Sequence, residues 1–409
     1  MNLQLQKADL QPPETVLAAR DKAGLSRLTV LIFAAACGLS VANVYFAHPL
    51  LDAIAHDFAI DPASVGIVVT ATQIGYALGL FFIVPLGDLL DRRKLIAGQA
   101  VLSALALVLV GFSPNAAVLL ASLAVVGLLA VVVQVLVAYA ADLAVPAERG
   151  RAVGTVTSGV ITGILLARFL SGLVADFAGW RSVYLASAVL TLVMAAILFR
   201  VLPRHEAKRA RTSYPRLLGS VLRLFVEEPL LRVRAVLAML IFASFNVLWA
   251  PLVLPLAAPP FSLSHTEIGL FGMAGVAGAL GARWTGVLVD RGQGQLVTGL
   301  SLLLMAAAWL PIAFMGKTLW LLVLGIVMLD LAIQAVHVTN QSLIFARRPD
   351  ARSRLVGGYM IFYSLGSALG SIASTMIFGA WGWSGVCLLG AGLGLVALAF
   401  WAVTLRVGR

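Results

Sequence analysis

Long apolar stretches recur along the chain, and they limit its fold more than any other feature of the sequence. A helix of about 20 apolar residues crosses the roughly 30 Å hydrocarbon core of a bilayer. Because the stretches are continuously apolar and do not alternate with polar residues, they predict helices. Hydrophobic residues make up 61% of the chain and charged residues only 11%, which excludes a soluble globular protein. We predict an all-α membrane protein with twelve spans, near residues 28–50, 64–86, 95–113, 117–141, 152–176, 182–199, 234–256, 267–289, 296–315, 319–345, 355–378 and 385–405.

Lysine and arginine residues predict the direction of the chain in the membrane. With the N-terminus placed in the cytoplasm, 25 of the 29 basic residues fall on the cytoplasmic side. Only Arg181 and Lys317 fall outside, and Arg168 and Arg283 lie within predicted spans. This asymmetry follows the positive-inside rule, so we expect both termini in the cytoplasm. Topology then explains the net charge of +11, and we expect the lipid bilayer as partner and no nucleic acid.

The chain also repeats itself at an offset of 203 residues. Residues 146–185 return in altered form at 349–388, so that Pro146 matches Pro349. Two halves with six spans each would be parallel repeats, related by an axis along the membrane normal. Apolar residues at helical spacing between Leu217 and Phe225 predict an interfacial helix between the halves, although a flexible tether fits the same segment. We expect an N-terminal tail at 1–26, a six-helix bundle at 27–200, a cytoplasmic linker at 201–232 and a second six-helix bundle at 233–409.

A short loop motif occurs once in each half. Gly87, Asp91 and Arg92 follow the second span with the spacing Gly-x-x-x-Asp-Arg, and Gly286, Asp290 and Arg291 follow the eighth span with the same spacing. The glycine permits a tight approach of two helices, and the carboxylate and guanidinium can clamp them in one conformation and release them in another. The motif predicts a cytoplasmic gate.

With twelve spans, two parallel halves and this motif twice, the sequence resembles the major facilitator superfamily over essentially its whole length. The resemblance implies alternating access, a loop that stabilises the outward-open state together with an acid such as Asp142, and a cavity lined by spans one, four, seven and ten. It is similar to bacterial drug/proton antiporters of the inner membrane, although Arg168 stands where their span-five motif has proline and Lys94 where the loop signature has glycine.

Polar residues within the spans are the candidate site. Asp330 is the only acid deep within a predicted span, and it begins a helical stripe with Gln334, His337 and Gln341. A desolvated carboxylate beside an imidazole suits proton coupling, which we assign to Asp330, His337 and Arg168. The alternative is that Asp330 only fixes helix packing. We expect a substrate cavity lined by Asn43, Gln134, Asn246, Gln334, Asn340 and Gln341, which could equally form interhelical hydrogen bonds.

Arg168 leaves three possibilities open. It can pair with Asp330 across the two halves, it can bind an anionic group of the substrate, or it can extend outward toward Asp176.

The predicted function is secondary active transport of a small organic solute, with export in exchange for protons. The alternative is a carrier of organic acids or phosphorylated metabolites anchored by Arg168. The five histidines are scattered, and no zinc-protease or phosphate-loop motif occurs, so we predict no enzyme, no cofactor and no metal. We expect a monomer in a bacterial inner membrane.

Overall fold

A computed structural model describes residues 26–145, 148–202, 213–347 and 352–405, except for the side chains at 88, 276–284, 286, 290, 346–347 and 352–353. Every regular element within these residues is a helix. The order is α2 (Arg27–Tyr45), α3 (Leu51–Phe58), α4 (Ile67–Phe82), α5 (Arg92–Gly111), α6 (Ala116–Ala130), α7 (Val132–Leu143), α8 (Arg149–Ala178), α9 (Trp180–Val201), α10 (Tyr214–Glu227), α11 (Pro229–Trp249), α12 (Val253–Ala257), α13 (His265–Asp290), α14 (Gly294–Ala313), α15 (Leu319–Arg347) and α16 (Arg352–Thr404), with short 3₁₀ turns η1 (His48–Leu50), η2 (Pro62–Ser64) and η3 (Val84–Asp88).

The prediction of an all-α membrane protein is confirmed. Ten helices of the described residues are long and apolar enough to cross a membrane. One of them, α16, carries the last two expected spans, because the backbone breaks at Gly382 with φ 61° and ψ −158°. Only glycine adopts such a conformation readily, so this residue permits the turn between the two spans. The eighth expected span is α13, which is 26 residues long.

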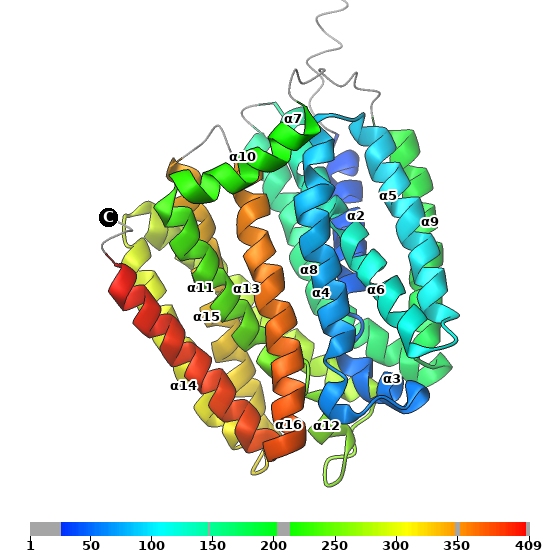
Figure 1. The fold of residues 1–409 in the computed structure, drawn as a ribbon, viewed down its shortest axis with the longest axis vertical. Helices are drawn as coiled ribbons and strands as arrows, with labels where there is room; N and C mark the ends of the chain where they lie inside the picture. Colours follow the sequence, from blue (N-terminus) through cyan, green and yellow to red (C-terminus); the bar gives the residue numbers. More distant parts are fainter. Residues whose placement is uncertain (1–25, 146–147, 203–212, 348–351, 406–409) are drawn as a thin grey trace, which may run out of the picture.

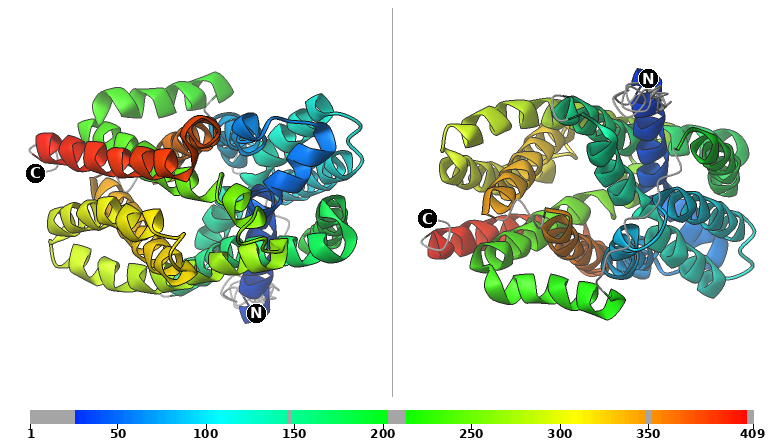
Figure 2. Two further views of the ribbon diagram at one scale, coloured as in Figure 1. Left: turned by 90° about the horizontal axis from the view of Figure 1, so that it is seen from below. Right: turned by 90° about the horizontal axis from the view of Figure 1, so that it is seen from above.

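The helices form two groups that lie side by side, α2 to α9 and α11 to α16 (Figure 2). The groups meet where α8 packs against α13 and where α4 packs against α16. Glycines permit this close approach, because a Cβ at Gly172 would lie 2.1 Å from the carbonyl oxygen of His265. A Cβ at Gly66, which precedes α4, would lie 2.3 Å from the carbonyl oxygen of Ser371. Backbones this close maximise van der Waals contact in a membrane.

Helix α10 lies across one end of the molecule and contacts both groups (Figure 1). The Tyr214 hydroxyl donates to the carbonyl oxygen of Phe82 at the end of α4 (2.7 Å), and the ring of Phe225 lies 5.4 Å from that of Phe362 in α16. We call this end of the molecule the linker end. The opposite end, where α3 and α12 lie, is the far end (Figure 1).

Candidate functional site

A cavity of about 350 Å³ lies between the two groups of helices. Most of its lining is aliphatic or aromatic, and its polar side chains come from α2, α4, α7, α8, α15 and α16. These are Tyr45, Gln73, Tyr76, Gln134, Thr157, Arg168, Asp330, Gln334, His337, Gln341 and Tyr363. An apolar cavity with a few polar groups is the usual form of a small-molecule site. We call it the central cavity.

The central cavity opens toward the linker end. A second cavity of about 600 Å³ shares Gln134, Val137 and Phe345 with it and extends to Arg149 and to Leu217 of α10. On the other side, toward the far end, the described residues around Arg168 enclose a space of about 10 Å³. The conformation is therefore open at one end and closed at the other.

Arg168 lies at the closed end of the central cavity and is only 2% exposed. Its guanidinium carbon lies 3.8 Å from the ring centre of Trp249 and 5.3 Å from those of Tyr45 and Phe245. These rings, which we call the aromatic cage, stabilise the buried cation through their π faces. Its Nε and Nη2 atoms have no hydrogen-bond partner among the described residues.

Asp330 is the second charged group of this closed end and is also buried. Its Oδ1 has no hydrogen-bond partner among the described residues. The carboxylate and the Arg168 guanidinium interact electrostatically across the two groups of helices. They form no ion pair within 4.0 Å in the described structure. Two opposite charges therefore face the cavity without neutralising each other by contact.

Four of the expected residues of the helical stripe line the central cavity, namely Asp330, Gln334, His337 and Gln341, and Gln134 lies on the opposite wall. The Nδ1 atom of His337 lies 2.9 Å from the Tyr359 hydroxyl, and its Nε2 atom lies 3.3 Å from Nε2 of Gln341. The sequence-predicted pair of Asp330 and His337 thus lies on one cavity wall.

Three expected cavity residues lie instead in helix contacts and do not line the cavity. Asn43 accepts a hydrogen bond from Ser187 (2.6 Å), and Asn340 accepts one from Arg234 (3.1 Å). Asn246 Oδ1 lies 3.2 Å from the His48 ring. Each is at most 3% exposed, so its side chain satisfies a neighbouring helix, as in the alternative reading of these residues.

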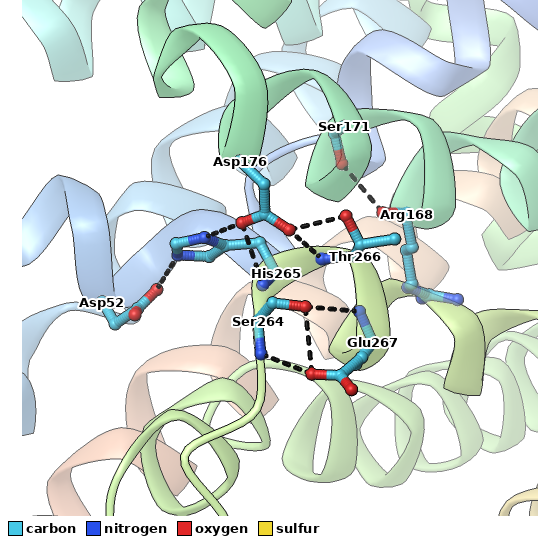
Figure 3. Close-up of polar contacts among 8 residues, drawn as sticks. All are labelled: Asp52, Arg168, Ser171, Asp176, Ser264, His265, Thr266 and Glu267. Atoms are coloured by element: carbon cyan, nitrogen blue, oxygen red, sulfur yellow. Dashed lines mark hydrogen bonds and ion pairs between the residues drawn. The ribbon is translucent and has the colours of Figure 1, made fainter.

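A polar cluster closes the far end (Figure 3). The Asp176 carboxylate, in α8, accepts hydrogen bonds from the backbone N–H of His265 (3.2 Å), the backbone N–H of Thr266 (2.8 Å) and the Thr266 hydroxyl (2.5 Å). His265 Nδ1 lies 2.8 Å from Asp176, and Nε2 lies 3.2 Å from Asp52 in α3. We call Asp52, Asp176, His265 and Thr266 the far-end latch. It joins the N-terminal group of helices to the first turn of α13.

The latch perturbs the titration of its histidine, which lies before the expected span 267–289. The hydrogen bond to Asp52, followed by its charge and by Asp176, raises the pKa of His265 to about 9 against the opposing effect of burial. His265 is therefore cationic at neutral pH. The Asp176 carboxylate is bound by His265 and Thr266. Arg168 lies in the aromatic cage instead, so the expectation that it extends outward to Asp176 is not met.

The loop motif of the first half forms contacts within that half. Asp91 caps α5 by accepting from the backbone N–H groups of Arg93 (2.8 Å) and Lys94 (3.2 Å). Arg92 donates to Asp142 in α7 (2.5 Å) and to the carbonyl oxygen of Gly87 (3.0 Å). These contacts hold the loop against α7 at the linker end.

The structure describes the side chain of one residue of the matching motif in the second half, Arg291. Positions 286 and 290 lie outside the side chains that the structure describes, and Arg291 is exposed at the end of α13.

Several residues of the site give no signal in the sequence. Tyr45 and Tyr363 donate and accept a hydrogen bond between α2 and α16, and Trp249 stacks on Arg168. Aromatic residues within apolar spans look like ordinary packing residues. His265 lies in a polar connection whose spatial neighbours are 89 and 213 residues away in the chain.

These features define a membrane transporter with a binding cavity between two groups of helices. Comparisons with known proteins agree. The sequence profile of the Major Facilitator Superfamily matches residues 29–291 and 235–409, and the chain belongs to this superfamily.

Relatives and solved structures support the assignment. The transporter YgaY of Escherichia coli is 46% identical over 377 residues, which cover 92% of this chain and 95% of the relative. The transporter SCO4007 of Streptomyces coelicolor is 32% identical and covers 97% of this chain and 93% of its own. The crystal structure of the nucleoside transporter NupG has the same fold, with a TM-score of 0.74 at 14% identity, covering 91% of this chain and 98% of that one.

Proposed function

We propose that the protein is a proton-coupled secondary transporter that exports a small organic solute across the bacterial inner membrane. The observation that carries this proposal is the presence of two buried, oppositely charged residues, Asp330 and Arg168, at the closed end of a cavity that opens toward the linker end; each has polar atoms without a hydrogen-bond partner among the described residues. Intramembrane acids are energetically costly and mark proton or ion pathways. The excess of basic residues supports a cytoplasmic location for the linker end and for both termini.

The proposed cycle uses Asp330 as the proton site. In the outward-facing state it takes a proton from the outside, and in the inward-facing state it releases that proton to the cytoplasm. Because each protonation state changes the charge facing Arg168, it also changes the balance between the two conformations. His337 lies on the same wall of the cavity, where its imidazole can relay a proton.

The two ends of the molecule would alternate as gates. The far-end latch ties the two groups of helices together in the closed far end. At the linker end, Arg92 and Asp142 hold the loop in place, and we assign Gly87, Asp91, Gly286, Asp290 and Arg291 to the same cytoplasmic gate. Only a state with one gate open can exchange solute without leaking protons.

One observation favours a second candidate, a carrier of organic anions. The free Nε and Nη2 atoms of Arg168 form a donor pair that matches a carboxylate or phosphate. In this candidate the anion would bind beside a protonated Asp330, so that proton and solute would move together.

Proton flux tests the proposal. A ligand-stabilisation screen on the purified protein supplies the solute, and proteoliposomes loaded with a pH-sensitive dye report its coupling to protons. We expect Asp330→Asn to retain reconstitution and to lose solute-dependent proton flux. The matched control, Asp61→Asn, changes an exposed far-end carboxylate and should keep that flux. Flux of normal size in the Asp330 variant would exclude this residue from coupling.

A further inference from the structure

Arg168 lines the central cavity, and two of its buried nitrogens have no hydrogen-bond partner among the described residues. The aromatic cage contacts the guanidinium through the faces of its rings, whereas the guanidinium makes hydrogen bonds in its own plane. Nε and Nη2, the two nitrogens without a partner, lie on the same side of the planar group. Two parallel N–H bonds from one side of an arginine match the two oxygens of a carboxylate. An arginine at the cavity wall with this edge unpaired therefore suits a carboxylate.

An acceptor of opposite charge lies beside this donor pair. Asp330 has its Oδ1 free, and Arg168, Tyr45 and Trp249 are the groups that interact with it. The same two side chains lie along one face of α13, where glycines leave room for them. A Cβ at Gly272 would lie 3.2 Å from Arg168 Cδ, and one at Gly275 would lie 2.4 Å from Asp330 Oδ2. Three residues of helix correspond to about 4.5 Å along its axis, so the aliphatic stem of Arg168 and the carboxylate of Asp330 lie beside adjacent turns.

A ligand with a single charge satisfies only half of this arrangement. A monovalent anion on Arg168 would leave the Asp330 oxygen without a donor and would place two negative charges together. A monovalent cation on Asp330 would leave the Arg168 nitrogens without an acceptor and would place two positive charges together. Buried charges are stable only when paired and hydrogen-bonded. A short ligand with one group of each charge satisfies both.

We propose that the central cavity binds a small zwitterion with an apolar body, of the class of α-amino acids with apolar side chains. This inference rests on the proposed transport function and names its substrate class. The ligand carboxylate binds the Nε and Nη2 atoms of Arg168, and its ammonium group binds Asp330. The apolar body lies among the aliphatic and aromatic residues that dominate the cavity wall, including Val44, Ile164 and Ile333.

The same geometry explains why proton and solute would move in opposite directions. The ligand ammonium group and a proton compete for the carboxylate of Asp330, so each excludes the other. An exchanger needs such competition, because one site must carry either the proton or the solute. A purely anionic ligand would instead bind better when Asp330 is protonated, which gives movement in the same direction.

A series of related ligands tests the proposal without mutation. Calorimetric titration of the purified protein would use L-leucine, N-acetyl-L-leucine, which lacks the ammonium group, and L-leucine methyl ester, which lacks the carboxylate. We expect L-leucine to bind and each analogue to bind about tenfold or more weakly, the loss that one charged hydrogen-bonded group produces. Binding of L-leucine should also weaken as the pH is lowered from about 8 to about 5.5, because the proton competes for Asp330.

Two variants assign each charge to its residue. Arg168→Gln should remove the preference for L-leucine over its methyl ester, and Asp330→Asn should remove the preference over N-acetyl-L-leucine. Arg234→Gln is the matched control, because this arginine is equally buried at 1% exposure but lies outside the cavity. It should retain both preferences in whatever fraction of the protein folds.

The outcomes separate this inference from the proposed function. Equal binding of L-leucine and N-acetyl-L-leucine, or no binding of any of these probes, would overturn the zwitterion proposal. Neither result affects proton-coupled transport of another solute, which depends on the flux assay with Asp330→Asn. Binding of L-leucine with both preferences, but without proton flux, would overturn the transport proposal and retain the site.

Discussion

The far-end latch should hold the molecule closed more firmly in acid than in alkali. His265 has a pKa of about 9 in the closed latch and an ordinary value of 6.5 once the latch opens. A group whose pKa is raised in one state stabilises that state when it is protonated. The contribution to closure is therefore complete below about pH 6.5, declines between pH 6.5 and about pH 9, and is absent above it. His265→Gln should remove this pH dependence.

The magnitude follows from the same two values. A pKa that rises from 6.5 to about 9 corresponds to about 3 kcal/mol of preference for the closed state. The side chain of His265 is 24% exposed, so solvent and salt reduce this preference. We expect about 1 to 2 kcal/mol, which changes the ratio of closed to open molecules by about five- to thirtyfold.

Spin labels can measure that ratio. His56 and Thr318 are exposed at the far end, in α3 and between α14 and α15, and cysteines at these positions would carry the labels. The native residues Cys37 and Cys387 are buried and should label poorly. Double electron–electron resonance should show a long-distance population that grows between about pH 6 and about pH 10, and His265→Gln should show no such growth.

A matched control separates charge from hydrogen bonding. Thr266→Val removes an uncharged donor from the same latch, so it should raise the open fraction at every pH and leave the pH dependence intact. The reasoning would be refuted by an unchanged pH profile in His265→Gln, or by opening of the wild-type protein in acid.

Three further substitutions and one control substitution test the packing and the gates. Gly275→Val should prevent binding of the solute, measured by calorimetry, because a Cβ at this position would lie 2.4 Å from Asp330 Oδ2. Asp142→Ala should lower the free energy of unfolding by less than about 1 kcal/mol, because this carboxylate is 62% exposed. The loss should be smaller still in high salt, which screens the ion pair with Arg92. A loss of several kcal/mol in a denaturation assay would contradict this. Gly75→Ala should lower the free energy of unfolding by about 1 to 3 kcal/mol, because its Cβ would lie 1.9 Å from a carbonyl oxygen of α6. Gly98→Ala is the control and should leave this free energy unchanged, because no atom lies within 4 Å of the added Cβ.

The spans and the charged residues of the site were predictable from the sequence. In a membrane helix the backbone polar groups are hydrogen-bonded within the helix, so that only the side chains contact the lipid. Long stretches of apolar side chains are therefore needed. Asp330 and Arg168 stand out for the same reason, because a charge in an apolar span is rare. These predictions depend on the residue and its neighbours in the chain.

The partners of each polar side chain were not predictable in this way. Asn43, Asn246 and Asn340 are uncharged amides within apolar spans, as are the glutamines that line the cavity, but the structure places these asparagines in helix contacts. Only packing decides whether a side chain of a span faces a cavity or a neighbouring helix.

Local hydrophobicity and charge alone therefore determined that this chain spans a membrane many times and carries costly charges, Arg168 and Asp330 among them, within its spans. The tertiary structure decided that Arg168 and Asp330 both line the closed end of one cavity, and that His265 reaches Asp52, 213 residues earlier in the chain, to close the far end. Lipid acts on each segment separately, whereas contacts between segments depend on how all the helices pack together.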